Sequence, residues 1–145
     1  MRVRTIVLAA GLAALAGAAY AQKAEGGRPL SAHLTGAAEK PTAGDPDGMG
    51  HATFRVNVGQ NQVCYEIGVE KIATGTMAHI HKAGPDAAGP VAIALKAPDA
   101  TGKVKDCATA DAAVVKDILQ NPGAYYVNVH NAEFPAGAIR GQLGK

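Results

Sequence analysis

The sequence predicts an all-β domain, an antiparallel β-sandwich with Greek-key-like connections and one short helix. Short segments in which apolar and polar residues alternate follow one another along the chain, and Gly, Pro, Asn and Asp separate them. Only one segment has the wider apolar spacing of a helix. Strands that follow one another without intervening helices are typical of antiparallel sheets. Because only 4% of the residues are aromatic, Val, Ile, Leu and Ala must fill the core.

The alternation predicts seven strands, of which the second and third form a hairpin. Residues 59–61, Gly-Gln-Asn, make the tight turn between them. Apolar residues alternate on both sides of this turn, at positions 52, 54, 56 and 58 before it and 63, 65, 67 and 69 after it. The hairpin therefore has one buried face. The predicted strands cover residues 29–37, 51–58, 62–70, 76–82, 90–96, 124–130 and 138–143.

One helix is predicted between the fifth and sixth of these strands. Thr109 or Asp111 can cap its first turn, and Asn-Pro-Gly at residues 121–123 ends it. Its apolar stripe comprises Val114, Val115, Ile118 and Leu119. We expect this helix to lie across an edge or an open end of the sandwich. Residues 38–50 contain prolines and glycines without apolar periodicity, which predicts a surface loop.

The first 21 residues have the pattern of a secretory signal peptide. Arg2 and Arg4 precede an apolar run over residues 5–19, and residues 19–21, Ala-Tyr-Ala, form a small-x-small cleavage site. The run is shorter than the roughly 18 to 20 residues that a membrane-spanning helix needs. We therefore expect a periplasmic or secreted protein that has no membrane attachment after cleavage. The alternative is a retained N-terminal anchor.

The mature chain is expected to be one domain without net charge. Residues 22–28 read as a flexible lead-in, and residues 29–145 as the domain. Cleavage removes two of the 14 basic residues and none of the 12 acidic ones, so the formal charge falls from +2 to zero. A neutral domain without a basic run is not expected to bind nucleic acid or anionic membranes. Pairing through the exposed faces of the sheets would give a homodimer.

Two cysteines, Cys64 and Cys107, are predicted to form a disulfide bond. An exported protein reaches a compartment in which disulfides persist, and two cysteines allow a single pairing. Closing a loop of this length stabilises a fold by roughly 4 kcal/mol in the chain-entropy model. The alternative is a metal site with two thiolates.

Three histidines form a candidate metal site. His79 and His81 are two residues apart on a predicted strand, so their side chains project to the same face. Ala78 and Ile80 then point into the core. On a later strand the apolar set is Tyr125, Val127 and Val129. His130 therefore lies on the face away from the core, as do His79 and His81. Neutral imidazoles suit copper, zinc, nickel or iron.

Other side chains are weaker candidates for the same site. His51 or His33 could supply a fourth ligand, although each also fits a solvated surface position. Met77 shares the face of His79 and could be a weak axial ligand, but methionine in a strand more often serves packing. The polar residues that could orient the imidazole rings by hydrogen bonds are Asn128, Glu133 and Glu66.

The chain resembles the CHRD (chordin) domain family in four segments that occur in order. These are Leu-Thr-Gly-Ala-Ala-Glu-Lys-Pro at residues 34–41, Gly-His-Ala-Thr-Phe at 50–54, Ala-His-Ile-His-Lys-Ala-Gly to Gly-Pro-Val at 78–91, and Tyr-Val-Asn-Val-His to Ile-Arg-Gly-Gln-Leu at 126–143. The resemblance implies an immunoglobulin-like or superoxide-dismutase-like β-sandwich. The domain also occurs in extracellular proteins without known catalysis, so the resemblance implies no particular activity.

A second, local resemblance concerns the histidines. His-x-His-x-x-Gly at residues 79–84 and Val-x-Val-His at 127–130 are similar to the copper-ligand order of Cu,Zn superoxide dismutases. This similarity implies that His79, His81 and His130 are copper ligands. The stretch after residue 84 lacks the histidine-rich zinc loop of those enzymes, so a mononuclear copper site is expected rather than zinc. Arg140 could steer an anion towards copper, or it could serve as a structural hydrogen-bond donor.

Two classes of function remain open from the sequence. The first is an exported protein that binds one copper ion and serves copper handling or superoxide-type redox chemistry, the latter as a copper-dependent oxidoreductase. The second is a periplasmic structural or interaction module, in which the histidines form a polar surface patch without a functional metal. A zinc-dependent hydrolase ranks last, because no general base accompanies the histidines in the sequence.

Overall fold

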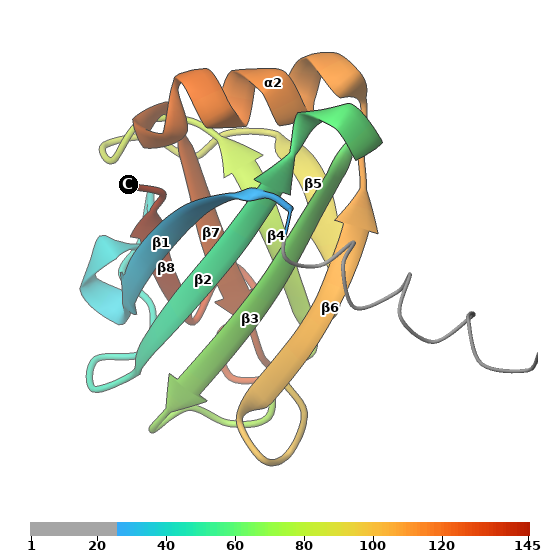
Figure 1. Cartoon of the computed structure of the whole chain (residues 1–145). Coiled ribbons are helices and arrows are strands. Elements are labelled where there is room, and N and C mark those ends of the chain that lie inside the picture. Colours follow the sequence, from blue (N-terminus) through green and yellow to red (C-terminus); the bar gives the residue numbers. More distant parts are fainter. Residues whose placement is uncertain (1–25) are drawn as a thin grey trace, which may run out of the picture.

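Eight antiparallel strands form one continuous sheet in the order β5-β4-β7-β8-β1-β2-β3-β6 (Figure 1). The computed structural model describes residues 26–145, so the predicted signal peptide and most of the predicted lead-in lie outside the described residues. The sheet curves until its edge strands, β5 and β6, lie on the same side of the molecule, which gives a nearly closed barrel. The strands are β1 (Arg28–Thr35), β2 (Met49–Asn57), β3 (Gln62–Glu70), β4 (Met77–Lys82), β5 (Val91–Leu95), β6 (Lys103–Thr109), β7 (Tyr125–His130) and β8 (Ile139–Gln142). The predicted all-β fold with one short helix is confirmed.

The predicted hairpin of β2 and β3 forms a large part of the core. Its inward side chains are almost completely buried, namely Ala52, Phe54, Val56, Val63, Tyr65 and Ile67. The inward position predicted for Val58 is wrong, because this side chain is 37% exposed. The strand ends one residue earlier, at Asn57, whose side-chain oxygen accepts a hydrogen bond from the Gln60 N–H and begins the 3₁₀ turn η2 (Val58–Gln60).

The helix α2 (Ala112–Gln120) lies across one open end of the barrel (Figure 1). Asp111, one of the two predicted caps, accepts a hydrogen bond from the Ala113 N–H at the first turn. Val115 and Ile118 are buried and close this end of the core. Asp117 accepts hydrogen bonds from Lys82 and Tyr125, which fixes the helix to β4 and β7. The predicted helix and its place are confirmed.

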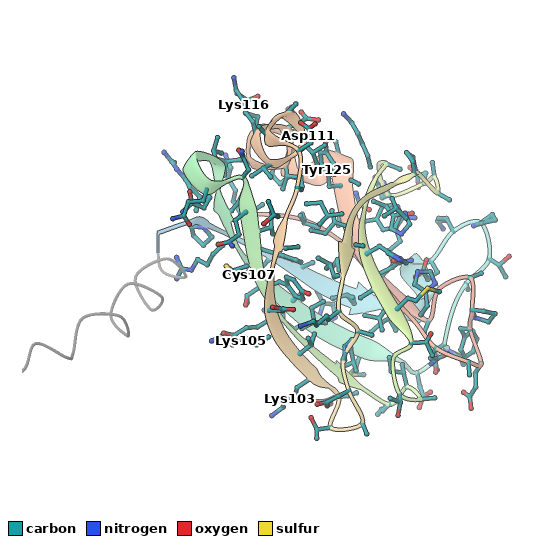
Figure 2. The ribbon with its side chains drawn as sticks, turned by 90° about the vertical axis from the view of Figure 1, so that its right-hand side faces the viewer. Lys103, Lys105, Cys107, Asp111, Lys116 and Tyr125 are labelled. Carbon is teal, nitrogen blue, oxygen red and sulfur yellow. A yellow bond between two sulfur atoms is a disulfide. The ribbon has the colours of Figure 1, made fainter. Side chains whose placement is uncertain are left out.

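The sequence did not predict strand β6. Only Val104 and Ala108 of this strand are apolar residues packed against the core, whereas Lys103 and Lys105 point outward (Figure 2). Such a weak alternation resembles a loop. Strand β6 pairs with β3 and brings Cys107 opposite Cys64. The two cysteines form a disulfide bond, as predicted.

The predicted surface loop between β1 and β2 is only partly at the surface. The 3₁₀ turn η1 (Gly36–Ala38) begins it, and Glu39 and Asp45 within it are buried. The chain packs so closely here that a Cβ atom at Gly44 would lie 2.2 Å from the carbonyl oxygen of Ala138. This loop therefore covers the outer face of the sheet where β7 and β8 meet.

Candidate metal centre

His79, His81 and His130 converge on the outer face of two neighbouring strands. Strand β4 pairs with β7, and the side chains of Ala78 and Ile80, which alternate with the two β4 histidines, are fully buried in the core. His79 and His81 consequently point outward. The last residue of β7, His130, points to the same side. The ligand nitrogens of the three residues all lie within 4.8 Å of one another. This group could hold a metal ion.

Backbone carbonyl groups fix the orientation of two of the rings. Nδ1 of His81 lies 2.9 Å from the carbonyl oxygen of Gly89, and Nδ1 of His130 lies 3.0 Å from that of Pro135. A carbonyl oxygen only accepts hydrogen bonds, so Nδ1 carries a proton in both rings, and Nε2 is the nitrogen whose lone pair is free for a metal when the ring is neutral. Nε2 of His81 is buried without a hydrogen-bond partner in the protein. A hydrogen bond from the second ring nitrogen to a carbonyl is characteristic of metal-binding histidines.

The third ring completes a cluster of three imidazoles. Nδ1 of His79 lies 3.2 Å from Nε2 of His130. Burial lowers the pKa of His79 below its usual value of 6.5, and the neighbouring His130 and His81 lower it further. Burial also lowers the pKa of His130, although the hydrogen bond to Pro135 acts in the opposite direction. The neutral form, which binds metals, is therefore favoured at neutral pH.

The ring of His81 is stacked on Tyr126, which in turn is stacked on Arg140. The ring of Tyr126 is parallel to the ring of His81, with centroids 4.8 Å apart. The guanidinium carbon of Arg140 lies 3.4 Å from the Tyr126 centroid. Strand β7 lies between β4 and β8, so the imidazole and the guanidinium cover opposite faces of the tyrosine ring. The stack holds His81 in one orientation, since its three members are almost completely buried.

Arg140 has a structural role in this arrangement. It is 1% exposed, and its Nη2 donates hydrogen bonds to the Gly84 carbonyl at 2.7 Å and to the Gln142 side chain at 3.1 Å. The bond to Gly84 connects β8 to the turn that follows β4, whereas the bond to Gln142 lies within β8. The sequence suggested two roles for Arg140, steering an anion towards a metal or donating structural hydrogen bonds. The structure supports the second, because the guanidinium group forms hydrogen bonds and stacks on Tyr126.

A buried carboxyl group lies beyond the stack. Asn128 is paired with His79 on one side and with Arg140 on the other. Glu39 is buried near Asn128 and Arg140, and burial raises its pKa to about 7 although both of these neighbours lower it. The outer face of β4, β7 and β8 is thus a continuous polar layer beneath the loops, and of the three histidines only His79 is partly exposed to solvent.

The other predicted ligands lie elsewhere. His51 is on β2, where it pairs with His33 on β1, and neither belongs to the three-histidine group. Met77 pairs with His130 across β4 and β7 and is 47% exposed, so it lies beside the group.

Among the described residues, none of the predicted orienting side chains, those of Asn128, Glu133 and Glu66, forms a hydrogen bond with an imidazole. Glu66 forms an ion pair with Lys105, and Glu133 is exposed in the connection between β7 and β8. The carbonyl groups of Gly89 and Pro135 take this role instead. Backbone acceptors leave no signal in side-chain patterns, and these two became apparent only in the folded chain.

Comparison with known proteins identifies the family. A model of the CHRD domain matches residues 30–143. The chain belongs to the CHRD domain family. No curated protein and no solved structure matches it. The matched part of this CHRD domain contains all three histidines and both cysteines. Within residues 26–145, no helix of the CHRD protein is long and apolar enough to cross a membrane.

Proposed function

We propose that this chain is an exported CHRD-domain protein that binds one copper ion through His79, His81 and His130 and serves in copper handling. One observation carries the proposal. Nε2 of His81 is buried and has no hydrogen-bond partner in the protein, while the ligand nitrogens of the two other imidazoles lie within 4.8 Å of it. An unpaired buried acceptor costs roughly 1 to 3 kcal/mol, and coordination of a metal ion would offset that cost.

The donor set fits copper. Among divalent first-row metals, nitrogen sites bind Cu²⁺ most tightly. The local similarity to superoxide dismutase ligands supports the same metal. Copper, when bound, supplies a one-electron redox couple. The residues of the chain would hold it, with the carbonyl groups of Gly89 and Pro135 and the ring of Tyr126 keeping the imidazoles in place.

Copper handling is favoured over superoxide-type redox chemistry. Rapid turnover of a small anion benefits from a cation that faces the metal. Arg140, the cation that the sequence suggested for this role, is buried and directed towards Gly84 and Gln142. Superoxide turnover by the copper-loaded protein should accordingly be slow.

The disulfide between Cys64 and Cys107 supports export. Such bonds persist in the periplasm and outside the cell and are rare in reducing compartments.

Electron paramagnetic resonance with one equivalent of Cu(II) tests the proposal. The wild type should give one tetragonal signal with imidazole nitrogen couplings. His130→Ala should lose the couplings to three imidazole nitrogens that mark this site, whereas Glu133→Ala, at an exposed carboxylate in the adjoining connection, should keep them. Circular dichroism shows whether both variants are folded. A folded wild type that releases its copper to a weak chelator would refute copper handling and favour the interaction module.

A further inference from the structure

Two further histidines face each other on the opposite side of β8 from the metal centre. His33 on β1 and His51 on β2 are direct partners in the strand register. Both are exposed, while their neighbours Ala32, Leu34 and Ala52 are buried. Strand β8 separates β1 from β7, so this pair cannot be a part of the three-histidine group.

The hydrogen-bond pattern brings the Cβ atoms of the two histidines close together. Ser31 exchanges two backbone hydrogen bonds of 2.8 Å with Gly144, on the side of β1 away from β2. Alternate residues of a strand direct their backbone groups to the same side, so those of His33 also point away from β2. His33 and His51 therefore form a non-hydrogen-bonded pair. Side chains approach most closely at such positions, with Cβ atoms about 4.5 to 5.5 Å apart.

The surroundings of the pair leave room for an ion and its water ligands. The partner of His51 on its other side is Gly68, and a Cβ atom at Gly68 would meet nothing within 4 Å. The two histidines line a shallow groove together with Glu70 and Lys103. The carboxylate of Glu70 would favour a cation in this groove, whereas the ammonium group of Lys103 would repel it.

We propose that His33 and His51 form a second metal site, which chelates a divalent transition-metal ion through two imidazoles. Water completes the coordination in the space above Gly68. Cu²⁺ is the tightest-binding candidate, followed by Zn²⁺ and Ni²⁺. The site has fewer protein ligands than the three-histidine group and is more exposed, so it binds more weakly and fills second.

Calorimetric titration of the full chain with Cu(II) tests this second site. The wild type should bind two equivalents. His33→Gln and His51→Gln should each weaken the second equivalent by at least about tenfold, because a chelate needs both rings. The loss of affinity for the second equivalent in the double variant should be far smaller than the two single losses combined, because either substitution alone already breaks the chelate. Ser31→Ala and Thr53→Ala change the next pair along the same strands and should leave both equivalents unchanged.

The two copper proposals fail independently. His130→Ala should remove the tight equivalent and leave the second one intact. If His33→Gln and His51→Gln each removed only part of the second equivalent and the double variant removed their sum, the rings would bind separately and the chelate would be refuted. A second equivalent that neither variant weakens, or a wild type that binds one equivalent unaffected by both variants, would also overturn the site.

Discussion

Glu39 is predicted to make this fold less stable as the pH rises. Its side chain is buried, and its Oε1 atom has no hydrogen-bond partner in the protein. Burial raises the pKa of the folded carboxyl group from 4.5 to about 7. The folded state therefore binds a proton more tightly than the unfolded state. Between these two values the free energy of unfolding should fall as the pH rises, and above pH 7 the whole loss should be present.

The expected loss is about 3 kcal/mol. It follows from the difference between a pKa of about 7 and 4.5, at about 1.36 kcal/mol for each pKa unit. Glu39→Gln removes the titration and keeps the shape of the side chain, which matters because Gly137 lies directly against this carboxyl group. The variant should match the wild type below pH 4.5 and exceed its stability by up to about 3 kcal/mol above pH 7.

Urea unfolding of both proteins at intervals between about pH 4 and pH 8 measures this difference. Titrations elsewhere in the molecule cancel when the two curves are subtracted. Glu133→Gln, at an exposed carboxylate, controls for the loss of one negative charge and should show no such pH dependence. The reasoning would be refuted if the difference in the free energy of unfolding between Glu39→Gln and the wild type stayed constant with pH, or if it shrank above pH 5.

Three further outcomes follow from the structure. Replacing Cys64 and Cys107 by Ser should lower the free energy of unfolding by roughly 4 kcal/mol, since the bond closes a loop with a sequence separation of 43 residues; chemical unfolding of both forms measures it. Tyr126→Leu removes the ring that stacks on His81 and should weaken copper binding about 10- to 100-fold in a competition titration with a chelator. Because burial lowers the pKa of both His79 and His130 below 6.5, protonation of these two ligands should weaken copper binding only in solutions more acidic than pH 6.5; an affinity that already falls between pH 8 and 7 would contradict this.

The sequence predicted the three-histidine group because its signal is local. Two histidines two residues apart on a strand must share a face, and the apolar alternation of the later strand placed His130 on the outer face. That the two strands are neighbours is a property of the whole topology. Similarity to a known ligand order supplied this part of the prediction.

The predictions failed where tertiary packing decides the outcome. Strand β6 exists because β3 offers it a partner and the disulfide joins them, whereas its own alternation is weak. Glu39 belongs to a segment that reads as a polar loop, yet the loop folds over β7 and β8 and buries it. The support of His81 by Tyr126 and Arg140 joins residues of three strands, so no single segment of the sequence contains it.

The disulfide also determines how a bound ion would connect the chain. Cys64 and Cys107 close a covalent ring that contains His79 and His81, while His130 lies outside it on β7. An ion held by all three histidines would fasten the C-terminal strands to that ring. A force applied at the C-terminus would then be carried by the metal ligands as well as by the hydrogen bonds of β7 and β8, so gain or loss of the ion would change the mechanical strength of the molecule at this end.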